Sequence, residues 1–187
     1  SGKNVSVAVL DKLLLRITLL REKNIIPGLA VVLVGNDPAS LLYVKSKTRK
    51  FNELKLLTET FIMDVNTPEQ ALLDLILELN QNDQFHGILV QLPLPKHINS
   101  QKVLETITPI KDVDGFHPEN VGLLSIGKPR FIPCTPKGIM RIFSYYDIKL
   151  KGKHIVVVGR SNIVGRPISI LTSLKQDEAD GTTTICH

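Results

Sequence analysis

The feature that most constrains this fold is the alternation of short, apolar, β-branched runs with longer segments of helical periodicity. Such short apolar runs are typical of strands that are buried on both faces of a sheet. The segments between them suit helices that cross over from one parallel strand to the next. The sequence therefore predicts the α/β class, with helices on both sides of parallel strands. The expected strands are residues 29–34, 60–63, 87–92, 155–158 and 182–186, of which the first, third and fourth are continuous apolar runs.

Capping residues predict where three of the helices begin. Asp37-Pro38 predicts the start of one helix, which runs to about Asn52. Thr67 is expected to cap a second helix from Pro68, and Thr135-Pro136 opens a third that ends near Tyr146.

The chain is expected to hold two domains, with a boundary between Pro136 and Gly152 that we place after residue 138. Only one helix and one strand follow the strand at 155–158. A dinucleotide-binding fold is built from two βαβαβ halves, so the part from 139 to 187 is expected to be incomplete in this chain.

Composition and charge narrow the class of protein. Hydrophobic residues make up 43% of the chain and charged residues 22%, which is ordinary globular usage and argues against disorder. The net charge of +5 favours anionic partners. Aromatic residues are only 5%, so the aromatic interleaving of single-strand binders is missing and no nucleic acid is expected.

The same sequence predicts a soluble protein of the cytoplasm. Asp11, Lys12 and Arg16 interrupt the apolar stretch near the N-terminus, so no membrane span or signal segment is expected there. Cys134 and Cys186 are too few for a disulfide framework, which favours a reducing compartment.

The clearest local motif is the apolar strand that runs into Gly159-Arg-Ser-Asn-Ile-Val-Gly165. Glycines after a buried strand allow a sharp turn and a close approach to a pyrophosphate, whose charge the following helix N-terminus favours. Ser161 stands where the middle glycine of G-x-G-x-x-G would be, and Gly165 comes one residue late. Arg160 is suited to pair with a ribose 2′-phosphate, which favours NADP over NAD. An ordinary strand-to-helix turn with a basic tip is the alternative.

A second candidate site lies on the helix that begins after Asp37. Tyr43 and Lys47 are four residues apart, so their side chains leave the same face of the helix. A flat ring beside an amine can stack on an aromatic substrate and move a proton next to it, and the like charge of Lys50 would favour the neutral amine. The alternative is a solvated basic face.

Polar residues mark two further positions. Gln91 lies near the end of an otherwise apolar strand, at the edge where ligands of parallel sheets bind, and it either contacts a ligand or caps local backbone. Asp112 and Asp114 are two apart and should have different environments, with an Asx turn ending at Gly115 as the alternative to a functional site. No metal site is predicted, because no metal-ligand spacing joins the cysteines to His86, His97, His117, His154 or His187.

Taken together, these motifs resemble the bifunctional methylenetetrahydrofolate dehydrogenase/cyclohydrolase family. They occur in the order of the family and extend over nearly the whole chain. The matching strings are Val34-Gly-Asn-Asp-Pro-Ala-Ser40, Tyr43-Val-Lys-Ser-Lys47, His86-Gly-Ile-Leu-Val-Gln-Leu-Pro-Leu-Pro95, Lys111-Asp-Val-Asp-Gly-Phe-His117, Pro133-Cys-Thr-Pro-Lys-Gly138 and Val158-Gly-Arg-Ser-Asn-Ile-Val-Gly-Arg-Pro167.

The resemblance implies roles for individual residues. Lys47 corresponds to the catalytic lysine, Tyr43 to the ring that stacks on the folate, and Gln91 to the amide that hydrogen-bonds the lysine. Asp114 corresponds to the carboxylate that holds the pterin, so the implied catalytic set is Lys47, Gln91 and Asp114. The implied residues for the diphosphate and 2′-phosphate of NADP are Gly159, Arg160, Ser161 and Gly165.

The resemblance also implies two α/β domains around a cleft, which would be a folate domain at 1–138 and a Rossmann-like NADP domain at 139–187. The implied activities are NADP-dependent oxidation of 5,10-methylenetetrahydrofolate and hydrolysis of the product to 10-formyltetrahydrofolate, in the one-carbon metabolism that serves purine biosynthesis. The implied partners are tetrahydrofolate derivatives and a second copy in a homodimer.

Two departures from the family leave other functions open. Family chains continue roughly a hundred residues further, in line with a half-built dinucleotide fold, and Lys175–Gly181 is longer and more acidic than the usual turn. One alternative is a truncated folate-binding module without catalysis. The other is another two-domain NAD(P)-dependent dehydrogenase, which would share the Gly159 loop but would not require Tyr43, Lys47, Gln91 and Asp114 to converge.

Overall fold

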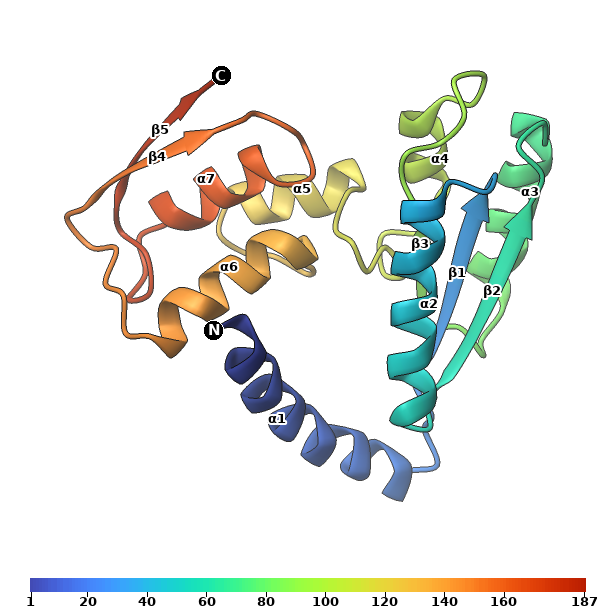
Figure 1. The fold of residues 1–187 in the computed structure, drawn as a ribbon, viewed down its shortest axis with the longest axis horizontal. Coiled ribbons are helices and arrows are strands. Elements are labelled where there is room, and N and C mark those ends of the chain that lie inside the picture. The colour runs from blue at the N-terminus through green and yellow to red at the C-terminus, as the bar shows by residue number, and fades with distance from the viewer. The chain divides into compact units, whose positions relative to one another are not determined.

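A computed structural model describes all 187 residues and shows two compact units. One unit is residues 11–113, and the other combines residues 1–10 with residues 114–187. This division into compact units does not test the boundary between functional domains that we expect after residue 138, so that boundary stays a prediction. The elements, labelled in Figure 1, are α1 (Gly2–Glu22), β1 (Gly28–Val34), α2 (Pro38–Glu53), β2 (Leu57–Met63), α3 (Glu69–Gln81), β3 (Gly87–Val90), α4 (Ser100–Thr106), α5 (Pro118–Ser125), α6 (Cys134–Tyr145), β4 (His154–Val158), α7 (Gly165–Ser173) and β5 (Thr182–Cys186).

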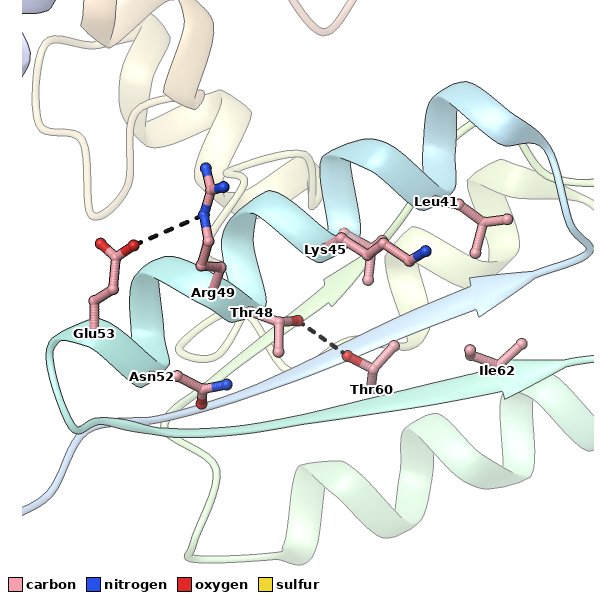
Figure 2. Close-up of a pocket in the computed structure, with 9 residues that line it drawn as sticks. Leu41, Lys45, Thr48, Arg49, Asn52, Glu53, Thr60 and Ile62 are labelled. Carbon is pink, nitrogen blue, oxygen red and sulfur yellow. Dashed lines mark hydrogen bonds and ion pairs between the residues drawn. The ribbon is translucent and has the colours of Figure 1, made fainter.

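Residues 11–113 fold around a parallel sheet in the order β2-β1-β3. Val31 of the central strand lies opposite Thr60 of β2 and Leu89 of β3. Helix α2 lies on one face of the strands and α3 on the other (Figures 1 and 2). The predicted α/β class with helices on both faces of a parallel sheet is confirmed for this unit.

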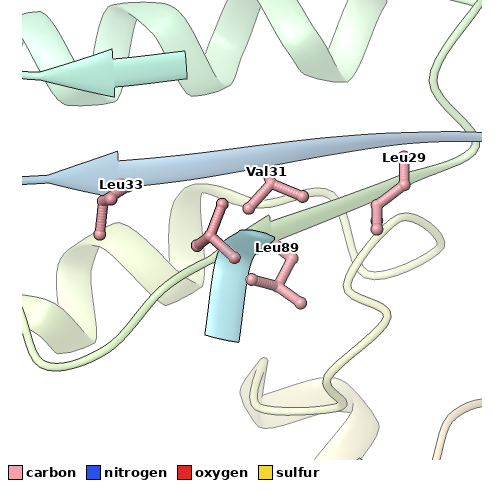
Figure 3. Close-up of a cluster of buried hydrophobic side chains, with 5 residues drawn as sticks. Leu29, Val31, Leu33 and Leu89 are labelled. Carbon is pink, nitrogen blue, oxygen red and sulfur yellow. The ribbon is translucent and has the colours of Figure 1, made fainter. Parts of the chain in front are cut away.

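The core of this unit forms because β1 and β3 are apolar throughout. Every residue of both strands is buried, as expected for parallel strands between two helical layers. Figure 3 shows Leu29, Val31 and Leu33 of β1 beside Leu89 of β3, and Val44 of α2 completes this cluster. The predictions that the runs at 29–34 and 87–92 are buried strands are confirmed, although β3 ends at Val90, two residues before the predicted end. The Gln91 N–H still donates to the Val32 carbonyl, but the next residue in line to donate is Pro93, which has no N–H.

Helix α2 begins where the sequence predicts. Asp37 is its N-cap, and a carboxylate oxygen of Asp37 accepts a hydrogen bond from the Ser40 N–H at 2.8 Å. Pro38 occupies the first turn, where its missing N–H costs nothing. The hydrogen bond from the Ser40 backbone lowers the pKa of the Asp37 carboxyl. This cap fixes the start of the helix that carries Tyr43 and Lys47.

Other helix boundaries differ from the predictions. Thr67 does not cap α3: the N-cap is Pro68, which offers no side-chain acceptor, and Thr67 instead places its carbonyl 2.9 Å from the His97 ring. Helix α6 begins at Cys134 and ends at Tyr145, next to the predicted bounds.

Three helices were not predicted from the sequence. Apolar residues lie all around α1, so several of its leucines are exposed and no single stripe marks it. Helices α4 and α5 are only 7 and 8 residues long, which is too short to show periodicity.

In the second unit, β4 and β5 form a parallel two-stranded sheet that α7 covers. Thr172 of α7 joins Thr183 of β5 through a 2.9 Å hydrogen bond between their hydroxyls. The prediction that the run at 155–158 is buried on both faces is wrong for this chain. Val156 and Val158 are 55% and 83% exposed, because α7 covers only the face on which Ile155 and Val157 lie.

No helix of the structure combines the length and the apolar character that a membrane span requires.

The packing predicts a clear contrast between two neighbours on α3. Ile76 is fully buried, whereas Leu77 is 52% exposed. Ile76→Ala should lower the free energy of unfolding by about 2–5 kcal/mol, because it removes buried methyl groups and leaves a cavity. Leu77→Ala should change it by no more than about 0.5 kcal/mol. Urea unfolding followed by circular dichroism measures both, and equal losses would contradict the packing described here.

Candidate active site

A hydrogen bond joins the two residues that the sequence places at the centre of the site. The Lys47 ammonium donates to Gln91 Oε1 at 3.1 Å. Lys47 lies on α2, and Gln91 is the first residue after β3, where its backbone N–H still donates to the Val32 carbonyl at 2.8 Å. Both residues are half-buried. The contact that the family resemblance implied between these two side chains is therefore present.

The orientation of the Gln91 amide is fixed by a second hydrogen bond. Its Nε2 donates to the carbonyl of Leu92 at 2.8 Å. If the amide were turned over, its NH2 group would face the ammonium and its oxygen would face another oxygen, so both hydrogen bonds would be lost. Gln91 therefore presents a neutral acceptor to Lys47.

Tyr43 lies one helical turn before Lys47 and is 65% exposed. Residues four apart on a helix lie on one face, so the Tyr43 ring leaves α2 on the same face as the Lys47 side chain. Its exposure leaves the aromatic surface open to a planar ligand. This arrangement is compatible with the predicted stacking role.

Lys50 has a different environment from the one expected. Its ammonium lies 2.5 Å from a carboxylate oxygen of Glu53, and this hydrogen bond lowers the pKa of Glu53. Because the charge of Lys50 is compensated by Glu53, it does not act on Lys47 as an isolated like charge. We therefore assign Lys50 no part in the chemistry of Lys47.

Asp112 and Asp114 have different environments, as their spacing predicts. Asp112 is buried and forms a bridge to Ile88 of β3. Asp114 is half-buried and precedes Gly115, which has a positive φ of 70°. Asp112 thus belongs to the edge of the sheet, whereas Asp114 lies at a turn in the unit that holds residues 114–187.

The loop after β4 makes a tight turn that requires glycine at two positions. Gly159 has a φ of 123°, which disfavours residues with a side chain. A Cβ on Gly165 would lie 2.3 Å from the Gly159 carbonyl oxygen, so only glycine fits this cradle. The Ser161 hydroxyl accepts hydrogen bonds from the N–H groups of Val164 and Gly165 at 3.2 and 3.3 Å.

Arg160 projects from this loop and is exposed. The loop leads into α7, whose N-terminus favours an anion. Gly159, Arg160, Ser161 and Gly165 could therefore hold the phosphates of a dinucleotide. No group of three or more His, Cys, Asp or Glu side chains is arranged to hold a metal ion.

The sequence left open whether Gln91 contacts a neighbour or caps local backbone, and the structure shows both, through Lys47 and the Leu92 carbonyl. Sequence reasoning did not identify Leu92 as the residue whose carbonyl orients Gln91. A main-chain oxygen leaves no mark in the sequence, and only the position of Gln91 next to it could have suggested the contact. Chemically, a lysine amine held by a neutral amide can donate and accept a proton beside a bound substrate.

The chain matches two family models. The model for the tetrahydrofolate dehydrogenase/cyclohydrolase catalytic domain matches residues 1–114, and the model for the NAD(P)-binding domain of the same family matches residues 133–187. The bifunctional protein FolD of Acetivibrio thermocellus is 48% identical over 187 residues. That alignment includes all of this chain and 64% of the relative, so the chain spans less than two thirds of its length.

Solved structures agree with these matches. A bifunctional FolD from Campylobacter jejuni superposes with a TM-score of 0.93 at 44% identity, over all of this chain and 65% of the other. A FolD from Trypanosoma brucei, complexed with NADP and an inhibitor, gives a TM-score of 0.93 at 32% identity, over all of this chain and 63% of the other. The chain belongs to the tetrahydrofolate dehydrogenase/cyclohydrolase family.

Proposed function

We propose that the protein containing this chain oxidises 5,10-methylenetetrahydrofolate with NADP and hydrolyses the 5,10-methenyl product to 10-formyltetrahydrofolate. The observation that carries the proposal is the Lys47–Gln91 hydrogen bond of 3.1 Å in a chain of this family. The proposal is supported by the Campylobacter jejuni neighbour, which is described as a methylenetetrahydrofolate dehydrogenase/cyclohydrolase. The Trypanosoma brucei neighbour was solved with NADP.

Lys47 has the central role in the hydrolytic step. Water adds to the methenyl carbon, and a proton must leave that water as the new C–O bond forms. A second proton must reach the folate nitrogen whose bond to this carbon breaks when the ring opens. An amine beside the substrate can take the first proton and give the second, so one group serves both transfers.

Gln91 keeps this amine available for both tasks. Its Oε1 holds the Nζ in place without adding a charge, and the Leu92 carbonyl prevents the amide from turning. A carboxylate at the same position would stabilise the ammonium and oppose the loss of its proton. We assign Gln91 and Lys47 to catalysis and substrate binding on this basis.

Tyr43 and Asp114 complete the proposed folate site. The exposed ring of Tyr43 would stack on the substrate. The carboxylate of Asp114 would accept hydrogen bonds from the amino and ring nitrogens of the pterin. Asp114 joins the proposed catalytic residues because it holds the ring that carries the reacting carbon.

NADP would bind at the loop after β4, where the Gly165 cradle leaves no room for a side chain. Gly159, Ser161 and Gly165 would lie against the diphosphate, and the Arg160 guanidinium would pair with the 2′-phosphate. When bound, the cofactor accepts the hydride from the methylene carbon, and the protein contributes orientation.

The proposal includes the organisation of the protein. Residues 1–138 would form the folate domain, and residues 139–187 the start of the NADP domain. The protein would act as a homodimer in the cytoplasm and supply one-carbon units, including those for purine biosynthesis. Two cysteines in the whole chain are too few for a disulfide framework, which supports a reducing compartment.

Folate binding without turnover is the second candidate function. Formation of NADPH from NADP and 5,10-methylenetetrahydrofolate separates the two. The same assay with an amino or hydroxy acid in place of the folate separates both from a dehydrogenase with such a substrate.

Gln91→Glu tests the role of the neutral amide. The new carboxylate would hold Lys47 as ammonium, so hydrolysis at neutral pH should fall by about 100-fold or more, and the pH–rate profile should move to higher pH. Gln84→Glu, at an exposed glutamine before β3, is the matched control and should leave the profile unchanged. An unchanged profile in Gln91→Glu would remove Gln91 from this role.

Arg160→Ala tests which part of the cofactor the arginine contacts. Losing a charged hydrogen bond to the 2′-phosphate should weaken NADP binding by about 10–100-fold. NAD lacks this phosphate, so its binding should change by less than about threefold. Arg141→Ala, at an exposed position of α6, is the control. Equal losses for the two cofactors would show that Arg160 does not contact the 2′-phosphate.

A further inference from the structure

Strand β2 is the outer strand of its sheet and has a free edge. It pairs only with β1, and the sheet order is β2-β1-β3. The Leu57 N–H donates to the Pro27 carbonyl, and the Met63 carbonyl accepts from Gly35. Main-chain groups in a parallel ladder alternate between the two sides of a strand. The N–H and C=O groups of Thr58, Thr60 and Ile62 therefore point away from β1, towards the free edge.

A cavity of about 490 Å³ runs beside this edge, between α2 and β2 (Figure 2). Leu41, Val44 and Ile62 contribute apolar wall, and the hydroxyls of Thr48 and Thr60 share a 3.3 Å hydrogen bond across it. Ile62 is 65% exposed. The lining residues are Leu41, Val44, Lys45, Thr48, Arg49, Asn52, Glu53, Thr60 and Ile62, and we call this cavity the α2–β2 groove.

The rim of the α2–β2 groove carries more positive than negative charge. Lys45 and Arg49 are exposed cations on the groove side of α2. Glu53 is the only acidic side chain in the lining, and it lies 3.7 Å from Arg49. Lys45 is in no ion pair. An acidic group in the groove would therefore meet a complementary charge.

We propose that the β2 edge and the α2–β2 groove together bind an extended peptide segment of a partner protein. The peptide would add a strand to β2, with its main chain paired to Thr58, Thr60 and Ile62. Side chains on one face of a strand recur every second residue. Those facing α2 would place apolar groups against Val44 and Ile62 and an acidic group near Lys45.

A second copy of this chain fits the same surface less well. Antiparallel pairing of two β2 strands would bring two groove rims towards each other, and both rims carry more positive than negative charge. Each chain also carries a net charge of +5, which adds repulsion. An acidic, extended peptide would bind the same edge without this repulsion between like charges.

The test uses fluorescence anisotropy of labelled heptapeptides with the 187-residue chain. One peptide is Thr-Val-Thr-Glu-Thr-Val-Thr, so that its two valines and its central glutamate lie on the same face of the strand. The matched peptide has lysine in place of the glutamate. The glutamate peptide should bind with a Kd of about 10–100 µM and at least about fivefold more tightly than the lysine peptide at low salt.

Two variants and one control make the test specific. Lys45→Glu should reverse the preference between the peptides, because it reverses the charge at the rim. Ile62→Pro removes an edge N–H and an apolar side chain, so it should abolish binding of both peptides. Lys12→Glu, on the exposed surface of α1, should leave the preference unchanged.

Three results would overturn the proposal. The first is no binding of either peptide at about 1 mM protein, far above the expected Kd. The second is a preference that Lys45→Glu leaves unchanged. The third is self-association in sedimentation experiments that Ile62→Pro abolishes, which would assign the α2–β2 groove to a second copy of the chain. Reversal of the preference shows that the effect of Lys45→Glu is local, since an unfolded variant would bind neither peptide.

Discussion

The hydrogen bond between Lys47 and Gln91 is the interaction on which the candidate active site depends. It joins α2 to the end of β3, two elements that the fold places next to each other only because β1 and β3 pair and α2 packs over β1. The core under α2 therefore does more than stabilise the unit. It sets the distance at which an amine and an amide meet.

Helix α2 serves two surfaces at once. Tyr43 and Lys47 belong to the folate site that we propose, while Lys45 and Thr48 line the α2–β2 groove beside the free edge of β2. The Asp37 cap fixes the beginning of this helix, and the Thr48–Thr60 hydrogen bond holds its middle to the sheet. Both surfaces are thus positioned by the same short set of contacts.

Much of this architecture could be predicted from the sequence. The strands β1 and β3 and the start of α2 follow from strong local signals, namely continuous apolar runs and the Asp37-Pro38 pair. The structure therefore agrees with these predictions. Thr67 failed as a cap because Pro68 occupies the N-cap position, a choice that the local sequence left open. The exposure of Val156 and Val158 depends on which elements cover a sheet, and an apolar run cannot show that. The compensation of Lys50 by Glu53 and the bond from Gln91 to Leu92 depend on side-chain orientation, which sequence spacing does not fix.

The central claim is that the Lys47 amine moves the protons of the hydrolytic step, and Lys47→Met tests it most directly. Methionine keeps much of the length of the side chain and removes its proton donor and acceptor. Hydrolysis of 5,10-methenyltetrahydrofolate, followed by its absorbance, should fall to the uncatalysed rate while folate still binds in a titration. Substantial hydrolysis by the variant would contradict this account.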